Sequence, residues 1–300
     1  MGVFIMRRWT QRTHLAGLVA LTLTACAPAE RVPVRGGVAV TDDASRRVTL
    51  AAPARRVVSL LPSFTEILFA IGAGDRLVGR TTWCDYPPEA LAVPSVGDGM
   101  PPSVEAVAAR HPDLVVLYRS GPNVAAAEQL ERLGIRTVLF DLNLLDQLGP
   151  AARRLGVLTG QGKRADSLAG VMDSLATQPP APSTQSLAFI VWDNPPIVIG
   201  AGSYLDRLAA LAGARNVFHD VSSPSAQVSI ETIAARDPDF VAVLTDSAVP
   251  PRYATRPEWR VVRAVRTARF LFLPGQLFGR PGPRAAVAIR ELRRRLEAAP

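Results

Sequence analysis

The sequence predicts an α/β protein built from two lobes that a single long helix joins. Three observations predict this class. Short apolar, β-branched runs alternate with amphipathic helical segments in both halves of the 300 residues, which is typical of βαβ units with mostly parallel sheets. One helix–strand unit recurs, because Val104–Leu117 and Ile230–Val243 are identical at seven of fourteen positions. Between the two copies, residues 145–178 have Leu, Ala and Met at helical spacing and no strand pattern.

The first half alternates strands and helices in order. Arg56–Leu60 (RVVSL) is β-branched and apolar, which indicates a buried strand. A Ser or Thr ahead of Glu66 then marks a helix start, and Gly72 marks its end. The other expected elements of this half are a polar turn and strand at Asp42–Leu50, strands at Leu77–Gly79, Asp113–Tyr118 and Arg136–Phe140, helices at Val104–Arg110 and Val124–Leu133, and a turn-rich loop at Trp83–Pro88.

Residues 145–178 are expected to form the connecting helix. Gly156, Gly160 and Gly162 interrupt its apolar spacing, so a bend or a break within it stays open. The proline-rich segment TQPPAPST ends it, and strand–helix alternation then resumes. The expected elements of the second half are strands at Leu187–Trp192, Phe240–Leu244 and Phe270–Leu273, and helices at Tyr204–Ala212 and Pro283–Leu296.

The N-terminus has the pattern of a secretion signal. Residues 1–14 carry three arginines and no acid, and residues 15–25 (LAGLVALTLTA) are apolar, which is too short for an ordinary membrane-spanning helix. The run Leu-Thr-Ala-Cys26 resembles the bacterial lipobox, so Cys26 is the expected site of lipidation. An ordinary signal peptide with an incidental cysteine is the alternative. The mature protein is then extracytoplasmic, in the periplasm or at the cell surface, and anchored in a membrane through lipid.

These patterns divide the chain into five parts. Residues 1–25 are the expected lipoprotein signal peptide and 26–44 a tether. Residues 45–144 form the N-terminal lobe, 145–178 the connecting helix and 179–300 the C-terminal lobe. Two α/β lobes joined in this way leave a cleft between them, which is the commonest place for a small-molecule site. A stiff connector limits how far such a cleft closes.

Composition argues against several other classes. The net charge is +8, but only one of the 34 basic residues is lysine and no long run of like charge occurs, so nucleic-acid binding is not expected. Two cysteines and three histidines leave little material for a metal cluster, and no metal or cofactor is expected. Gly200–Ser203 lacks both the nucleophile elbow and the third glycine of a dinucleotide-binding turn. We therefore predict that the protein is not an enzyme.

A resemblance now appears in the order of the motifs. The lipobox, RVVSLLPSFTEILFAIGAGDRLVGRT, CDYPPEA, VEAVAARHPDLVVL, QLERLGI, the long helix, NPP and IETIAARDPDF follow one another in order, and the resemblance covers about residues 45–295. This series resembles the substrate-binding proteins of ABC importers for cobalamin, haem and iron siderophores. Its motifs are most similar to those of the cobalamin binders. The resemblance implies two Rossmann-like lobes with a helical backbone. It also implies a monomer that passes a ligand, here a cobalamin-like corrinoid, to a permease and ATPase complex.

The resemblance also implies roles for individual residues. Glu105 and Glu231, one in each copy of the repeat, match the glutamates that dock on the importer, whereas a solvated first-turn glutamate is the alternative reading. Ligand contacts are expected from aromatic side chains and from two arginines that could pair with ligand anions, namely Trp83, Tyr118, Trp192, Phe278, Arg119 and Arg280. Core packing is the alternative for the aromatic residues, and solvation for the arginines.

The ligand itself stays open at this point. Gly99–Met100 and Ser225 stand where the cobalamin binder has tryptophans. A binder of haem or of an iron siderophore with the same fold is therefore an alternative. A lipoprotein that senses a ligand without transporting it is a further alternative, of a different class.

Overall fold

The computed structural model describes residues 37–183 and 185–299. The predicted signal peptide, Cys26 and residues 26–36 of the predicted tether lie outside this range. Within it, no helix combines the length and the apolar character that crossing a membrane requires. Residues 38–44 were expected in the tether, but part of them is a strand. β1 (Val38–Thr41) pairs antiparallel with β2 (Arg47–Leu50), because Asp42 accepts backbone hydrogen bonds from Ala44 and Arg46 and so closes the turn between them.

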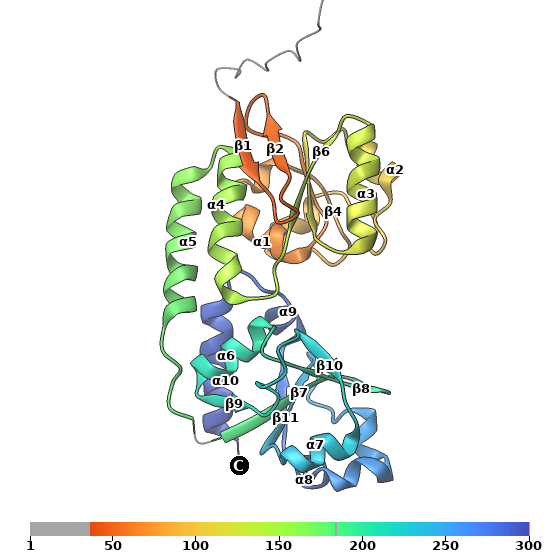
Figure 1. Ribbon diagram of the computed structural model, residues 1–300, viewed down its shortest axis with the longest axis vertical. Helices are drawn as coiled ribbons and strands as arrows, with labels where there is room; N and C mark the ends of the chain where they lie inside the picture. The colour runs from red at the N-terminus through yellow and green to blue at the C-terminus, as the bar shows by residue number, and fades with distance from the viewer. Residues whose placement is uncertain (1–36, 184, 300) are drawn as a thin grey trace, which may run out of the picture. The chain divides into compact units, whose positions relative to one another are not determined.

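The N-terminal lobe contains a four-stranded parallel sheet in the order β4-β3-β5-β6 (Figure 1). Its strands are β3 (Val57–Ser59), β4 (Leu77–Arg80), β5 (Leu114–Tyr118) and β6 (Arg136–Phe140). Its helices are α1 (Pro62–Ala70), α2 (Val104–Ala108) and α3 (Gly121–Arg132). These elements confirm the predicted alternation, because β-branched strands that are apolar on both faces are buried between helices.

The C-terminal lobe has a six-stranded mixed sheet. The strands are β7 (Gln185–Asp193), β8 (Pro196–Ile199), β9 (Ala214–Asn216), β10 (Ser225–Gln227), β11 (Phe240–Leu244) and β12 (Phe270–Leu273), in the order β10-β8-β7-β11-β12 with β9 also on β7. β9, β7, β11 and β12 run parallel, whereas β8 and β10 are antiparallel additions. The helices are α6 (Tyr204–Ala212), α7 (Ile230–Arg236), α8 (Arg263–Arg266), α9 (Gly275–Phe278) and α10 (Ala285–Ala298).

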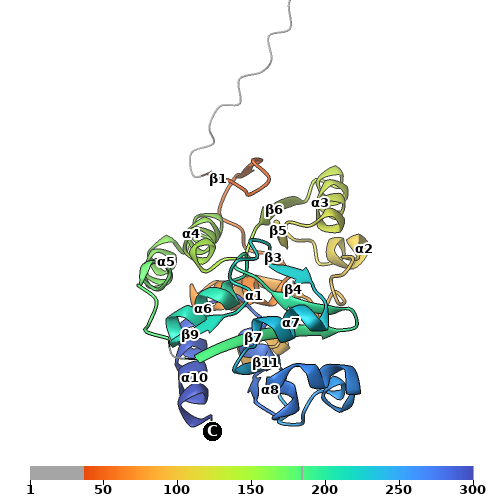
Figure 2. The same cartoon turned by 60° about the horizontal axis from the view of Figure 1, so that its bottom comes forward.

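The expected single connecting helix over 145–178 is wrong in one respect. After a short 3-10 turn the segment forms two helices, α4 (Leu148–Thr159) and α5 (Gly162–Thr177), which lie side by side in Figures 1 and 2. Gly160, with φ +66°, ends α4 in the left-handed region that favours glycine. Gly156 allows α4 to pack closely on α5, because a Cβ at this position would lie 2.2 Å from the Cβ of Ala165 in α5. Only α5 continues toward the C-terminal lobe (Figure 1).

The internal repeat seen in the sequence is also present in the structure. Ser103 caps α2 and Ser229 caps α7 through a side-chain hydrogen bond to the third amide after each serine. Each helix is followed by a left-handed residue, His111 at φ 46° and Asp237 at φ 42°, and then by a central parallel strand. The two lobes therefore contain the same helix–strand unit, as predicted.

One hydrophobic cluster extends through both lobes. It includes Phe64 and Phe140 of the N-terminal lobe, Leu155 of α4, and Phe189 and Leu292 of the C-terminal lobe, all fully buried or nearly so. Smaller clusters fill the remaining face of each sheet. Because close-packed interiors resist deformation, a shared core favours a fixed pairing of the lobes over a freely swinging hinge.

Candidate functional site

The predicted ligand residues of the N-terminal lobe lie where its parallel strands end. Trp83 follows β4, Tyr118 ends β5, and Asp141 and Asn143 follow β6. In α/β sheets, ligands bind outside the carboxyl ends of the strands. The indole of Trp83 is 60% exposed, and the Tyr118 hydroxyl donates to Asn143 Oδ1 at 2.9 Å. The fold therefore brings the two aromatic groups to the sheet edge on which function is expected.

The carboxyl ends of the C-terminal sheet present a second set of groups. β7 ends at Trp192 and Asp193, and β11 ends at Leu244. Trp192 is 59% exposed, and its indole N–H donates to the carbonyl of Asn194, which holds the ring in place. An exposed indole can stack on a flat ligand, which gives a large contact area at small entropic cost.

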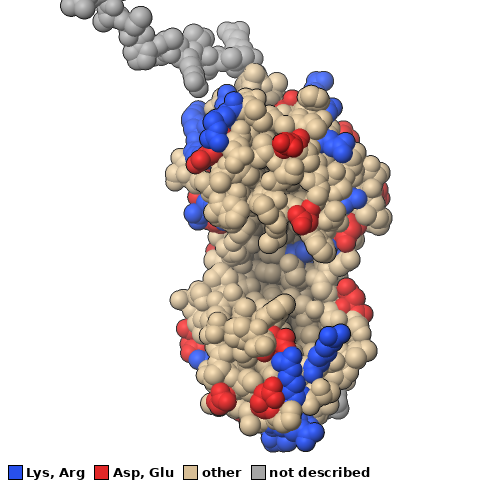
Figure 3. Space-filling model, turned by 90° about the vertical axis from the view of Figure 1, so that its right-hand side faces the viewer, with Lys and Arg blue, Asp and Glu red and all other residues tan. Residues whose placement is uncertain are grey.

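Polar contacts join these two edges directly. The backbone N–H of Tyr204 in α6 donates to the carbonyl of Asn143 in the N-terminal lobe at 2.6 Å. The other contacts form what we call the inter-lobe network, which consists of Glu66, Asp85 and Tyr86 from the N-terminal lobe and Gln276, Arg280 and Arg284 from the C-terminal lobe. The carboxyl ends of the parallel strands in the two lobes are thus linked. The space-filling view shows a hollow on one face of the described residues, with few charged side chains in it (Figure 3).

The centre of the inter-lobe network is a buried ion pair. Glu66 of α1, 3% exposed, accepts two hydrogen bonds from Arg284, at 2.8 and 2.5 Å. The same guanidinium lies 3.9 Å from the centre of the Tyr86 ring, a cation–π contact, and donates to the carbonyl of Gln276. Burial raises the pKa of Glu66, and the positive charge of Arg284 opposes this. Burial also raises the pKa of Tyr204, and the nearby charge of Glu66 adds to it.

The second part of the inter-lobe network is more open to solvent. Asp85 accepts from Arg280 at 2.5 Å and from Gln276 at 3.0 Å. The hydrogen bond from Arg280 holds the pKa of Asp85 below its usual range, although partial burial opposes this. An acid whose pKa is lower in the folded state stabilises that state above its unfolded pKa, and the stabilisation fades as the pH falls through the folded value.

We expect Asp85→Asn to lower the free energy of unfolding by about 1 kcal/mol at pH 7, because Asp85 is partly exposed and its pair is screened. The difference from the wild type is expected to shrink as the pH falls below 3.8, the ordinary pKa of Asp85. Urea unfolding at several pH values between 7 and 3 measures this. A difference that stays constant with pH would argue against the Asp85–Arg280 contact.

Three predicted ligand residues are placed differently from expectation. Phe278 is fully buried in the main core, so it packs the interior and does not line a surface. The apolar residues around it in α9 and α10 exclude it from solvent, which the sequence pattern at a lobe rim did not reveal. Arg280 is occupied by Asp85, and Arg119 forms an ion pair with Asp141 at 2.5 Å. Both arginines therefore already have carboxylate partners at the sheet edges.

Glu105 and Glu231 occupy equivalent exposed positions. Each is the second residue of its helix, directly after the serine-capped start. A hydrogen bond from its own backbone amide and one from Ser229 hold the pKa of Glu231 below its usual range, so this side chain is ionised at neutral pH. No described basic residue forms an ion pair with either glutamate. Each lobe therefore presents one exposed glutamate without an ion pair at the equivalent position of the repeat.

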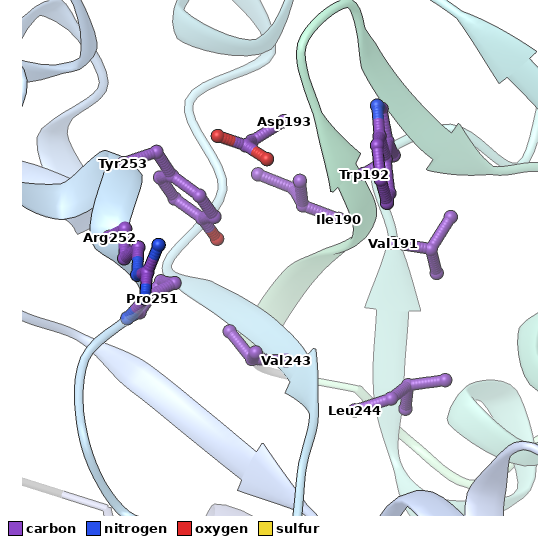
Figure 4. Close-up of a pocket in the computed structure, with 9 residues that line it drawn as sticks. All are labelled: Ile190, Val191, Trp192, Asp193, Val243, Leu244, Pro251, Arg252 and Tyr253. Carbon is purple, nitrogen blue, oxygen red and sulfur yellow. The ribbon is translucent and has the colours of Figure 1, made fainter.

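A pocket of about 380 Å³ lies at the carboxyl ends of β7 and β11 (Figure 4). It is lined by Ile190, Val191, Trp192, Asp193, Val243, Leu244, Pro251, Arg252 and Tyr253. Apart from Trp192, none of these was singled out from the sequence. Tyr253 and Arg252 reach the pocket from a 3-10 turn (252–255) whose local pattern carries no functional signal. Their importance depends on where β11 ends, which only the folded chain decides.

The inter-lobe network was missed as well. Glu66 was noted only as part of a helix start, and Arg284 only as part of a terminal helix. A charged residue on the apolar face of a predicted helix is a signal that could have found Glu66. Among the residues that the structure describes, no group of three or more His, Cys, Asp or Glu side chains could hold a metal ion.

Comparisons with known proteins agree with this architecture. The sequence profile of the periplasmic binding protein family matches residues 57–277. A vitamin B12-binding protein of Pectobacterium atrosepticum is 28% identical over 79% of this chain and 87% of its own length. An uncharacterized ABC transporter substrate-binding lipoprotein of Bacillus subtilis is 31% identical over 84% of this chain and 83% of its own. The structure of the apo periplasmic haem-binding protein of Roseiflexus sp. RS-1 superposes with a TM-score of 0.69 at 25% identity, over 82% of this chain and 98% of that one.

Proposed function

The chain belongs to the periplasmic binding protein family, and from this membership we propose that it captures a cobalamin-like corrinoid between its lobes and delivers it to an ABC importer. The observation that carries the proposal is the pair of exposed indoles, Trp83 after the parallel strand β4 of the N-terminal lobe and Trp192 at the carboxyl end of β7 in the C-terminal lobe. Tyr118 adds a third aromatic ring, at the carboxyl end of β5 in the N-terminal lobe. Flat macrocycles are bound by this kind of arrangement, because rigid rings give a large apolar contact. The similarity to a vitamin B12-binding protein supports the same ligand class.

The proposal includes the place of the protein in the cell. We propose that residues 1–25 are removed, that Cys26 carries the lipid anchor, and that the monomeric, non-catalytic mature protein works outside the cytoplasm. A lipoprotein of Bacillus subtilis among the relatives supports this, as does the family to which the chain belongs. Partners are then the permease and ATPase of an importer, on which Glu105 and Glu231 dock.

A second candidate ligand is haem. At the position of an expected tryptophan the chain has Gly99 and Met100, and Met100 is 83% exposed. The similarity to a haem-binding protein of the same fold favours this candidate too. Tyr118 is the candidate axial phenol, but its hydroxyl already donates to Asn143, so an axial role would require that hydrogen bond to break.

The test is a calorimetric titration of the full chain in detergent with cyanocobalamin, haemin and a ferric siderophore in parallel. Saturable one-to-one binding of cyanocobalamin at micromolar or lower Kd is the expected result. Binding of haemin alone would replace the ligand and leave the transport role standing. Binding of none of the three would contradict the proposal.

Trp83→Ala is expected to weaken binding of that ligand about five- to thirtyfold, because an aromatic stacking partner contributes about 1–2 kcal/mol. Leu133→Ala is the matched control, since Leu133 is 61% exposed and lies on α3's far end, away from the strand carboxyl edges. Equal Kd values for Trp83→Ala and Leu133→Ala would remove Trp83 from the site.

A further inference from the structure

The pocket at the ends of β7 and β11 contains a hydroxyl whose hydrogen-bonding capacity is unused. Tyr253 is 5% exposed and its ring packs on Trp259 with centroids 4.3 Å apart. Its hydroxyl is buried and has no hydrogen-bond partner among the described residues. Figure 4 shows this hydroxyl directed toward the space between Ile190 and Val243. A buried polar atom without a partner destabilises the folded state, so such an atom commonly indicates a missing partner.

The protonation state of the Tyr253 hydroxyl determines which ligand atoms it can bind. Burial raises the pKa of Tyr253, and the negative charge of Asp193 acts in the same direction. The phenol is therefore protonated at neutral pH and is a hydrogen-bond donor. A ligand atom that satisfies it is an acceptor, such as a carboxylate or phosphate oxygen.

The charges around the pocket favour an anion. Asp193 is compensated, because Arg256 forms an ion pair with it at 3.0 Å. Arg252, which also lines the pocket, is exposed and forms no ion pair with a described carboxylate. The pocket therefore has one uncompensated positive charge. An arginine fork binds carboxylate and phosphate groups with two parallel hydrogen bonds.

The remaining walls are apolar. Ile190, Val191, Val243 and Leu244 come from the two strand ends, and the exposed ring of Trp192 borders them. A group that fits this lining has an apolar or aromatic body and an oxyanion at its edge.

We propose that this pocket is a binding subsite for an oxyanion-bearing apolar group, with Arg252 and the Tyr253 hydroxyl holding a carboxylate or phosphate and Trp192 contacting the apolar body. This proposal rests on the proposed function, because the subsite would bind a substituent of the captured ligand. The chemistry is defined by the pocket itself, so it can be probed with small molecules.

The experiment is a titration of the full chain in detergent, labelled with 5-fluorotryptophan and followed by fluorine NMR. Trp192→Phe identifies the Trp192 resonance. The probes are phenyl phosphate and benzoate, which carry the two kinds of oxyanion, and benzyl alcohol, which is neutral. We expect saturable shifts of the Trp192 resonance with at least one anionic probe and weaker or absent shifts with benzyl alcohol. Which of the two anions binds more tightly separates a phosphate from a carboxylate ligand.

Two variants test the assigned residues. Arg252→Gln is expected to weaken binding of the anionic probe about tenfold or more, and Tyr253→Phe to weaken it severalfold. Arg260→Gln is the matched control, because Arg260 is exposed, lies a few residues away and does not line the pocket. The proposal is overturned if no probe shifts the Trp192 resonance, if benzyl alcohol binds as tightly as the anions, or if Arg260→Gln weakens binding as much as Arg252→Gln.

The two proposals fail separately. A chain that binds cyanocobalamin or haemin but none of the small probes keeps its proposed function and lacks this subsite. A chain that binds phenyl phosphate at Trp192 but none of the large ligands has the subsite and lacks the proposed function.

Discussion

Replacing Arg284 with methionine is expected to lower the free energy of unfolding at pH 7 by about 3 kcal/mol. The variant leaves the Glu66 carboxylate, whose side chain is 2% exposed, without its cationic partner. An unpaired buried carboxylate takes up a proton, and protonating a group of ordinary pKa 4.5 at pH 7 requires about 3.4 kcal/mol at 1.36 kcal/mol for each pH unit. Urea or thermal unfolding of the full chain measures the loss.

The pH dependence of the stability loss shows whether the unpaired charge of Glu66 causes it. Without Arg284, burial keeps the folded-state pKa of Glu66 above its unfolded value even more strongly than in the wild type. The penalty is therefore absent below the unfolded pKa and grows as the pH rises through the folded value. At pH 5 the part of the loss that comes from the unpaired charge is expected to fall below about 1 kcal/mol. The lost packing of Arg284 on Tyr86 adds a contribution that does not depend on pH.

Two further variants separate charge from packing. Combining Glu66→Gln with Arg284→Met removes both charges and is expected to recover most of the stability at pH 7. Arg294→Met is the control on the same helix, because its ion pair with Glu291 is 63% exposed on the arginine side and contributes little. If Arg284→Met lost the same stability at pH 5 and pH 7, the loss would come from packing and not from an unpaired Glu66.

Reversing the charge of both helix-start glutamates, Glu105→Arg with Glu231→Arg, is expected to reduce ligand uptake by cells to background. These side chains are exposed, uncompensated and placed alike in the two lobes. Opposite charges across an interface steer docking and set register, and like charges placed opposite one another oppose it by several kcal/mol. Ligand binding to the purified double variant is expected to be unchanged, since neither residue lies at a strand carboxyl end.

The control carries the same change in net charge. Glu128→Arg with Glu258→Arg also replaces one exposed glutamate in each lobe, but at positions unrelated by the repeat. We expect this variant to transport normally. Uptake at wild-type level in the Glu105/Glu231 variant would show that the protein does not dock on an importer through these residues, and would favour a ligand-sensing role without transport.

The local parts of the fold could be predicted because local interactions decide them. Strand β11 and helix α6 begin and end where the apolar pattern and the flanking Ser203 and Gly213 place them. The repeated unit was also visible, since Val104–Leu117 and Ile230–Val243 share seven of fourteen residues, including Glu105 and Glu231. The positions of two candidate ligand residues could be anticipated, because residues that follow parallel strands gather at one edge of the sheet, and Trp83 and Trp192 lie at such edges; their contact with a ligand stays a prediction.

Other features depend on residues that meet only after folding. Glu66 and Arg284 are 218 positions apart in the chain, and nothing in the local pattern of either indicates the other. Phe278 was expected as an aromatic ligand contact through the resemblance, yet it is fully buried in the main core, which agrees with the core-packing alternative. The connector was expected as one helix with a bend or break left open at its three glycines, and the local pattern does not show that the chain reverses there so that α5 packs on α4.

The sequence by itself thus determined the order and kind of the elements, the two-lobe α/β class and the paired glutamates, since these follow from periodicity, capping and repetition over a few residues. The tertiary structure decided which charges are neutralised, which rings stay exposed and where the chain turns back on itself between the lobes. Burial and ion pairing are properties of contacts between distant segments. Arg280 is therefore held by Asp85 while Arg252 is left uncompensated, although both are arginines in loops of similar composition.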